Sequence, residues 1–214
     1  MKSKIEIFEK HTKDYENWFE RHADLYDAEL KAVKALTPDF KKGVEIGVGT
    51  GRFAVPLGIR MGVEPSAHMA EVARERGIDV VVGVAEALPL PDESFDFALM
   101  VTTICFVDDA LKSLREIWRI LKPGGYVLVG FVDRESDLGR LYERNREKSR
   151  FYKDATFFST GEVLSLLKKA GFENCVAKQT LFGPDLEHME TSVKEGYGEG
   201  AFVAIRCRKP EMEK

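Results

Sequence analysis

Apolar residues along the chain change their spacing near residue 38. Over the first 36 residues, large side chains recur three or four positions apart, and this period predicts helix. The residues that carry it are Tyr15, Trp18, Phe19, His22, Tyr26 and Leu30. Thr37 ends the pattern, because the residue before a proline is disfavoured in helical geometry. We expect residues 1–40 to form an N-terminal helical cap and residues 41–214 to form the main domain.

Beyond residue 40, short apolar runs alternate with helical patterns. The runs that predict strands are Val44–Gly47, Ile59–Val63, Ile78–Val82, Phe95–Val101, Tyr126–Val132, Cys175–Gln179 and Ala201–Cys207. Helical patterns follow Ser66, Asp108 or Asp109, and Ser159, which are residue types that can cap a helix N-terminus. Apolar strands that alternate with helices predict a parallel sheet covered on both faces. The last two strands have no helix between them. We therefore expect an α/β fold with a doubly wound, mostly parallel seven-stranded sheet and one antiparallel edge strand.

The composition is that of an ordinary globular protein. The chain has 214 residues, of which 44% are hydrophobic and 32% are charged, which suits one α/β domain with a small additional segment. It has no apolar run long enough for a membrane helix, and none follows the basic residues near its N-terminus. We expect a cytoplasmic protein with no membrane partner, and the sequence leaves its oligomeric state open.

The net charge of −4 argues against nucleic acid as a partner, because phosphate-binding proteins usually carry a basic excess. One stretch, residues 134–153, is rich in arginine, but acidic residues are interleaved with the basic ones. We interpret it as a solvated helical surface, with a site for an anionic acceptor as the alternative.

Cysteine and histidine positions do not favour a disulfide or a metal site. Cys105, Cys175 and Cys207 are far apart and lack CxxC spacing, so we expect free cysteines that act as small hydrophobic residues. The four histidines show no HxH or HxxxH spacing, so no metal ion is expected. The sequence has few Asn and Gln residues and many charged residues, and this composition weakly favours a heat-adapted source.

A glycine-rich turn, Glu45-Ile46-Gly47-Val48-Gly49-Thr50-Gly51, follows the first predicted strand. Ligands of open α/β sheets bind beyond the carboxyl ends of the strands, where glycines let them approach the backbone. A following helix would present free N–H groups. A dinucleotide site requires GxGxxG, but Arg52 or Ala54 occupies the last position in either register. The turn therefore favours a nucleotide-like ligand other than a nicotinamide dinucleotide, with an ordinary tight turn as the alternative.

Two acidic residues follow later strands. Glu64 comes directly after the second strand, where a carboxylate can accept hydrogen bonds from both ribose hydroxyls. Glu86 follows the third strand and could accept a hydrogen bond from an exocyclic amine. An exposed loop glutamate without a role is the alternative for Glu64, and Glu86 taken alone is a weak signal. Beside the glycine turn, ligand binding becomes the better interpretation of Glu64.

Four stretches, taken in order, resemble the class I, Rossmann-like S-adenosylmethionine-dependent methyltransferases. They are VEIGVGTGRF, GVEPSAHMAEVARERG, GVAEALPLPDESFDFALM and LREIWRILKPGGYVLV. The resemblance is to the small-molecule branch related to the ubiquinone/menaquinone-biosynthesis enzymes, and it covers residues 43–132 closely. It implies S-adenosylmethionine as the cofactor and a small molecule as the methyl acceptor.

The resemblance also implies roles for matching residues. Gly47, Gly49 and Gly51 would pass under the methionine part of the cofactor, with Glu45 at the turn. Glu64 would hold the ribose hydroxyls.

On the adenine side, Pro65 and Met69 would pack near the ring. Ala85, Glu86 and Ala87 would reach its edge, with Glu86 as the acceptor for the amine. The family more often has aspartate at this position.

Thr102 would line the place where cofactor and acceptor meet, and in resembling enzymes a tyrosine near the position of Tyr15 often closes over the cofactor. We expect the N-terminal helical segment and the loop 181–200 to recognise the acceptor, with Tyr15, Trp18, Phe19 and His22 as candidates for a lid over the pocket. Aromatic residues packed on the core are the alternative. No Asn/Asp-Pro-Pro-aromatic motif follows the fourth strand, which disfavours methylation of exocyclic base nitrogens.

The segment after the glycine turn departs from the pattern of the resembling family, which usually has a longer helix between this turn and the next acidic residue. Twelve residues separate Gly51 from Glu64, with Pro56 among them, so we expect a helix of barely two turns.

A sulfonium methyl is a strong electrophile, so the protein mainly has to place the nucleophile in line with the S–CH₃ bond and exclude water. The sequence assigns no catalytic residue. The alternatives are a protein that binds the cofactor without catalysis and, less favoured, a nicotinamide-dependent oxidoreductase.

Overall fold

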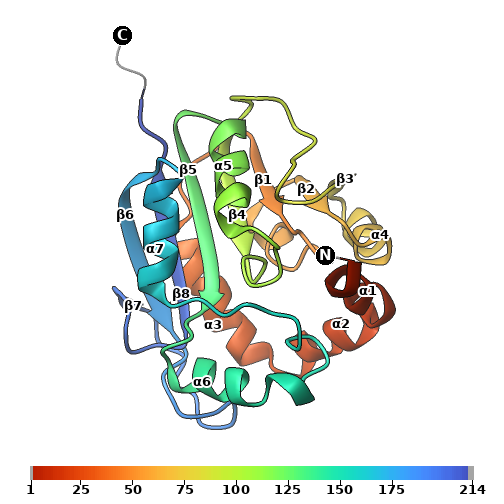
Figure 1. The fold of residues 1–214 in the computed structure, drawn as a ribbon, viewed down its shortest axis with the longest axis vertical. Coiled ribbons are helices and arrows are strands. Elements are labelled where there is room, and N and C mark those ends of the chain that lie inside the picture. The colour runs from red at the N-terminus through yellow and green to blue at the C-terminus, as the bar shows by residue number, and fades with distance from the viewer. Residues whose placement is uncertain (1, 212–214) are drawn as a thin grey trace.

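The computed structural model describes residues 2–211, which fold around one mixed β-sheet (Figure 1). Within this range the sheet has eight strands in the order β3-β2-β1-β4-β5-β8-β6-β7. The strands are β1 (Gly43–Ile46), β2 (Met61–Glu64), β3 (Asp79–Val82), β4 (Phe95–Val101), β5 (Leu121–Val132), β6 (Glu173–Thr180), β7 (Lys194–Glu195) and β8 (Phe202–Arg208). Strands β1 to β5 are parallel, whereas β8 is antiparallel to both β5 and β6.

The predicted doubly wound, mostly parallel sheet is confirmed, and so is the antiparallel pairing toward its last edge. The strand count is eight rather than seven among the described residues, because β7 pairs with Lys178 and Gln179 of β6. A two-residue strand is too short to show the alternation by which strands are recognised in a sequence.

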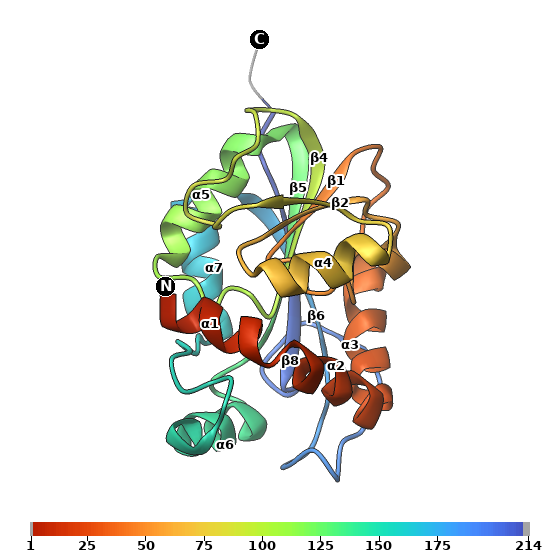
Figure 2. The ribbon, with the colours of Figure 1, turned by 90° about the vertical axis from the view of Figure 1, so that its right-hand side faces the viewer.

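Helices cover both faces of the sheet (Figure 2). They are α1 (Lys2–Lys10), α2 (Thr12–Arg21), α3 (Ala23–Leu36), α4 (Ala67–Glu75), α5 (Ala110–Ile120), α6 (Asp137–Arg144) and α7 (Thr160–Lys169). On one face, Leu114 of α5 and Leu167 of α7 belong to the same buried cluster as Val129 of β5. On the other face, Val33 of α3 and Ala73 of α4 belong to a second cluster. The predicted caps are present, since Ser66, Asp109 and Ser159 each accept a backbone hydrogen bond at a helix start.

The N-terminal segment is helical as predicted, but it forms three helices that break at His11 and His22. Helix α3 lies on the sheet, with Ala28, Ala32 and Val33 buried against it. Helices α1 and α2 lie with α6 at the end of the sheet where the parallel strands finish (Figures 1 and 2). The division of the chain at residue 40 into a cap and a domain stays a prediction.

The segment between β1 and β2 contains a single 3₁₀ turn, η1 (Val55–Leu57). Pro56 lies in its first turn, and Gly58 ends it with a φ of 72°. The expected two-turn helix is therefore wrong, because this short stretch has room only for the glycine turn and η1.

Two of the three cysteines are not free, which corrects the expectation from their spacing. Cys175 in β6 and Cys207 in β8 form a disulfide, with Cα atoms 4.1 Å apart. The residues are 32 positions apart, and antiparallel pairing of their strands brings them together. Linear spacing does not reveal that register. Cys105 is free and buried.

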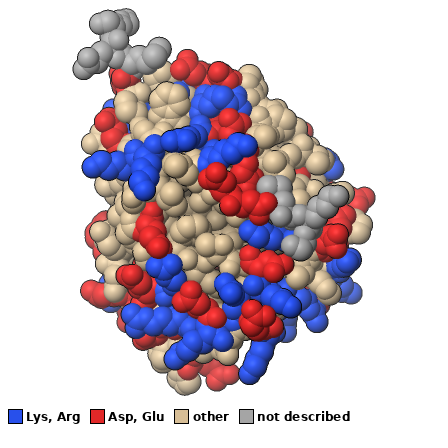
Figure 3. Space-filling view, in the orientation of Figure 1, with Lys and Arg blue, Asp and Glu red and all other residues tan. Residues whose placement is uncertain are grey.

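Basic and acidic side chains are mixed over the face shown in Figure 3. In the stretch 134–153, Arg140, Arg144, Lys148 and Arg150 are exposed, as the interpretation of a solvated surface requires.

Across residues 2–211, none of the helices has the length and apolar character needed to cross a bilayer. The same residues contain no grouping of three or more His, Cys, Asp or Glu side chains suited to a metal ion.

Candidate functional site

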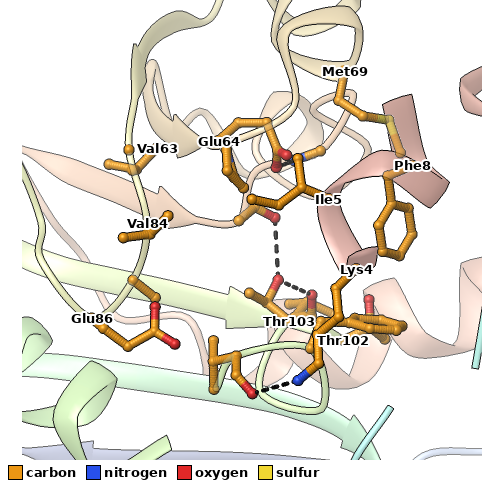
Figure 4. Close-up of a pocket in the computed structure, with 18 of the residues that line it drawn as sticks. Lys4, Ile5, Phe8, Val63, Glu64, Met69, Val84, Glu86, Thr102 and Thr103 are labelled. Carbon is orange, nitrogen blue, oxygen red and sulfur yellow. Dashed lines mark hydrogen bonds between the residues drawn. The ribbon is translucent and has the colours of Figure 1, made fainter. Parts of the chain in front are cut away.

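A cavity opens at the carboxyl ends of β1, β2 and β4, and α1 forms its outer wall (Figure 4). We call it the strand-end cavity; its volume is about 810 Å³, including the part open to solvent. Of the predicted cofactor-binding residues, those that line it are Tyr15, Gly47, Gly49, Glu64, Pro65, Met69, Ala85, Glu86 and Thr102. Those outside the lining are Glu45, Gly51 and Ala87.

The glycine turn packs tightly against the end of β4. Gly47 and Gly49 have φ angles of 70° and 53°, in the left-handed region that favours glycine. A Cβ on Gly47 would lie 2.4 Å from the Thr103 side chain, whose Oγ1 donates a hydrogen bond to Gly47 O at 3.2 Å (Figure 4). Gly51 instead faces Ile78, outside the cavity. Gly47 and Gly49 therefore leave bare backbone at the cavity wall.

Glu64 fixes the position of the turn. Its carboxylate accepts hydrogen bonds from the backbone N–H groups of Gly49 and Ser66, each at 2.9 Å. The side chain is buried, and burial raises its pKa to about 7. A carboxylate has more acceptor positions than these two bonds use. Glu64 can therefore hold the turn and still accept hydrogen bonds from hydroxyl groups in the cavity.

Glu45 lies beneath the turn, outside the cavity lining. Its carboxyl accepts a hydrogen bond from the backbone N–H of Ala54, and burial raises its pKa well above the usual range. Its Oε2 has no hydrogen-bond partner among the described residues. This position suits a role in orienting the turn, because the side chain connects β1 to the residues that follow the last glycine.

Glu86 lines the cavity and also anchors a neighbouring loop. Its Oε1 accepts hydrogen bonds from the backbone N–H groups of Asp108 at 2.7 Å and Asp109 at 3.3 Å. Ala87 lies outside the lining, because a tight turn pairs its backbone with Val84. The anchoring of the start of α5 by Glu86 was not predicted from the sequence.

Helix α1 supplies three lining residues that were not predicted, Lys4, Ile5 and Phe8. Lys4 Nζ donates a hydrogen bond to Val107 O at 3.1 Å and lies 3.2 Å from an Asp108 carboxylate oxygen. These contacts hold α1 against the loop that follows β4. The spacing of Ile5 and Phe8, three positions apart, is the signal that could have indicated a buried helix face.

A second cavity, the aromatic cavity, adjoins the first and has a volume of about 800 Å³, including its open part. Its aromatic lining residues are Phe8, Tyr15, Trp18, Phe19, Phe53, Phe106, Tyr142, Phe151 and Tyr152. Leu181 and Leu186 of the loop 181–200 also line it, whereas His22 does not. The residues that line both cavities are Phe8, Tyr15, Thr102 and Phe106. The N-terminal helices and the loop thus enclose one space beside the strand-end cavity.

Tyr15 and Thr102 lie at the junction of the two cavities. A Cβ on Gly49 would be 3.4 Å from Tyr15 Oη, so the phenol is placed against the glycine turn. Burial raises the pKa of Tyr15 well above its usual value, which keeps the hydroxyl protonated. Thr102 has a φ of 50°, a strained conformation for threonine of the kind that is enriched at functional sites.

Glu29 is the one charged residue among the described residues that line the aromatic cavity. It is 5% exposed, and burial raises its pKa to about 8. Sequence reasoning missed it. The signal was present, because Glu29 lies on the apolar stripe of α3 formed by Leu25, Ala28, Ala32, Val33 and Leu36.

Comparison with known proteins establishes the family. A family model described as a methyltransferase domain matches residues 44–129. A crystal structure from Thermotoga maritima, described as an S-adenosylmethionine-dependent methyltransferase and possible histamine N-methyltransferase, is 63% identical. The match has a TM-score of 0.91 and covers 95% of this chain and 99% of that chain. The chain belongs to the S-adenosylmethionine-dependent methyltransferases.

This methyltransferase has further relatives. An uncharacterized protein of Methanocaldococcus jannaschii is 45% identical over 205 residues, which are 96% of this chain and all of the relative. The ubiquinone/menaquinone biosynthesis C-methyltransferase of Stenotrophomonas maltophilia is 30% identical over 65% of this chain and 69% of its own length. The class I methyltransferase resemblance is confirmed, and S-adenosylmethionine is the cofactor.

Proposed function

We propose that this methyltransferase transfers a methyl group from S-adenosylmethionine to a small-molecule acceptor by in-line displacement. The observation that carries the proposal is the junction of the two cavities at Tyr15 and Thr102. A cofactor in the strand-end cavity and an acceptor in the aromatic cavity would meet at this junction, enclosed by α1 and α2.

The strand-end cavity fits the methionine and ribose parts of the cofactor. The bare backbone at Gly47 and Gly49 would lie under the methionine part, where a side chain would obstruct it. The unused acceptor positions of Glu64 would take hydrogen bonds from the ribose hydroxyls.

The adenine would lie near Pro65 and the buried side chain of Met69. Ala85 and Glu86 would meet its edge. Since Glu86 Oε1 already accepts two backbone hydrogen bonds, Oε2 is the oxygen that would accept from the amine.

When bound, S-adenosylmethionine supplies a methyl group whose bond to sulfur breaks, with its electron pair moving to sulfur, as the acceptor's lone pair forms the new bond. Tyr15 and Phe106, which line both cavities, would exclude water from the junction. Positioning of the acceptor atom opposite the C–S bond can supply several kcal/mol, roughly 7–11 in the most favourable cases.

The acceptor classes to test first follow from the relatives. The Thermotoga maritima protein is described as a possible histamine N-methyltransferase, which supports a nitrogen acceptor. The Stenotrophomonas maltophilia relative is a C-methyltransferase, which supports carbon as the second choice. We would incubate the enzyme with methyl-labelled S-adenosylmethionine and panels of amines (including histamine), phenols, thiols and carboxylates. Absence of a methylated product from every panel would contradict the proposal.

The cofactor site is tested separately by calorimetry with S-adenosylmethionine, S-adenosylhomocysteine and NAD. We expect the first two to bind and NAD not to bind. Glu64→Ala should weaken S-adenosylmethionine binding at least about tenfold, since it removes acceptors for two hydroxyls. Glu75→Ala, at an exposed position of α4, is the matched control. If Glu64→Ala leaves the affinity within twofold, the ribose assignment is wrong.

A further inference from the structure

Glu29 is a buried carboxyl group that faces a cavity and has no polar partner among residues 2–211. It lines the aromatic cavity and is 5% exposed. Within residues 2–211, no hydrogen bond or ion pair to its carboxylate is found, and burial alone shifts its pKa. Its oxygens are also not among the described polar atoms that are completely enclosed and lack a hydrogen-bond partner, so they retain some accessible surface. The carboxylate is therefore directed to the space inside the cavity.

The surroundings of Glu29 do not satisfy a negative charge. The walls are aromatic and aliphatic side chains, and the tyrosines among them are neutral, because burial raises the pKa values of Tyr142 and Tyr152 above their usual range. A buried carboxylate without a partner is unfavourable, so Glu29 holds a proton when no cation is near, and a bound cation would stabilise its ionised form. Aromatic faces add to this preference, because their quadrupoles attract cations.

The aromatic cavity is also the space that opens toward the cofactor. Phe8, Tyr15, Thr102 and Phe106 line both cavities, so a molecule beside Glu29 lies in the same enclosure as the junction. One carboxylate among apolar walls suits a molecule with one positive charge and an apolar body.

We infer that the aromatic cavity is the acceptor site and that it selects apolar amines, whose ammonium group pairs with the Glu29 carboxylate. Transfer of one proton from the ammonium group to Glu29 would then free the nitrogen lone pair that forms the bond to the methyl carbon. This inference rests on the proposed function, since it names the acceptor class of that reaction. An anionic acceptor would be repelled by the ionised form of Glu29, and a neutral one would form no ion pair with it. Glu29 thus determines specificity by contact with the acceptor.

The first experiment measures binding without turnover. Three probes have the same apolar body and differ in charge: 2-phenylethylamine, 2-phenylethanol and phenylacetate. Calorimetry with the enzyme loaded with S-adenosylhomocysteine should show the amine binding at least about tenfold more tightly than the alcohol, and no binding of the carboxylate. Equal or tighter binding of the alcohol or the carboxylate would overturn the inference.

The second experiment changes the carboxylate. Glu29→Gln keeps the size of the side chain and removes its charge, so amine affinity should fall at least about 30-fold, whereas that of the alcohol should be unchanged or higher. Glu29→Leu should show the same pattern. Glu20→Gln, at an exposed position of α2, is the matched control and should bind as the wild type does. Amine affinity in Glu29→Gln within threefold of the wild type would refute the role of Glu29.

The two proposals fail in different ways. If the enzyme methylates phenols or acids well and amines poorly, the acceptor class is wrong, whereas methyl transfer to a small molecule stands. If amines bind in a manner that depends on Glu29, but no panel yields a methylated product, the amine site stands and the proposed methyl transfer fails.

Discussion

Replacing Glu29 by glutamine should stabilise the ligand-free methyltransferase, and the effect should grow with pH. Glu29 is buried among apolar and aromatic groups, and burial raises its pKa from 4.5 to about 8. The folded protein therefore holds a proton on Glu29 in a pH range where the unfolded chain has released it. Since the folded state binds more protons, wild-type stability decreases as pH rises from about 4.5 through 8. Glutamine does not titrate, so the variant lacks this loss.

The magnitude follows from the difference between the two pKa values, 8 minus 4.5, or about 3.5. At roughly 1.36 kcal/mol for each pKa unit, the full effect is about 5 kcal/mol, an upper limit because water in the cavity reduces it. About 4 kcal/mol of it should develop between roughly pH 5 and pH 9. For a protein of this size, that corresponds to a rise in Tm on the order of 10 °C for Glu29→Gln over the wild type at the alkaline end.

The assay is thermal or urea unfolding of wild type, Glu29→Gln and the exposed control Glu20→Gln at several pH values, without ligands. Other buried carboxyl groups titrate in all three proteins and cancel in the comparison. The difference between Glu29→Gln and the wild type should be small near pH 5 and large near pH 9, whereas the control should follow the wild type. A difference that is constant from pH 5 to pH 9 would refute the claim that Glu29 is buried without a partner.

Three further outcomes are expected. Reduction of the disulfide, or the substitution Cys175→Ser, should lower the free energy of unfolding by about 3–4 kcal/mol, because the bond closes a loop of 32 residues. A reductant should lower the Tm of the wild type and leave the Tm of Cys175→Ser unchanged. In urea unfolding, Gly47→Ala should destabilise the fold far more than Gly58→Ala. The two glycines have similar φ angles, 70° and 72°, but only a Cβ at Gly47 would meet another side chain. Similar losses of stability would contradict the tight fit of the turn. In calorimetry, the affinity for S-adenosylmethionine should rise from pH 6 to pH 8, because the pKa of Glu64 is about 7 and the ribose hydroxyls donate hydrogen bonds to its ionised form. An affinity that does not change with pH would contradict this contact.

Much of the fold could be predicted because its signals are local. Ser66, Asp109 and Ser159 are polar caps directly before apolar periodic runs, and each one starts a helix in the structure. The range Phe95–Val101, a continuous apolar run, is a strand with the predicted bounds. Such features depend on residues a few positions apart, so a sequence displays them without knowledge of the tertiary structure.

The features that were missed depend on distant contacts. The disulfide depends on the pairing of β6 with β8. The strand β7 consists of Lys194 and Glu195, and it exists only because β6 offers an edge beside them. The η1 turn stands where a two-turn helix was expected, because Pro56 and Gly58 lie in a segment too short for more.

Two buried glutamates show why the candidate site was only partly predictable. Glu45 was singled out because it adjoins the glycine turn, yet it lies outside the cavity lining and bonds to the backbone of Ala54. Glu29 was passed over because α3 resembles any amphipathic helix, yet its carboxylate faces the aromatic cavity. A charged residue on an apolar stripe is unfavourable unless something compensates for it. Its presence among Leu25, Ala28 and Ala32 was therefore evidence for a binding role, and the compensating partner is the acceptor that the structure leaves room for.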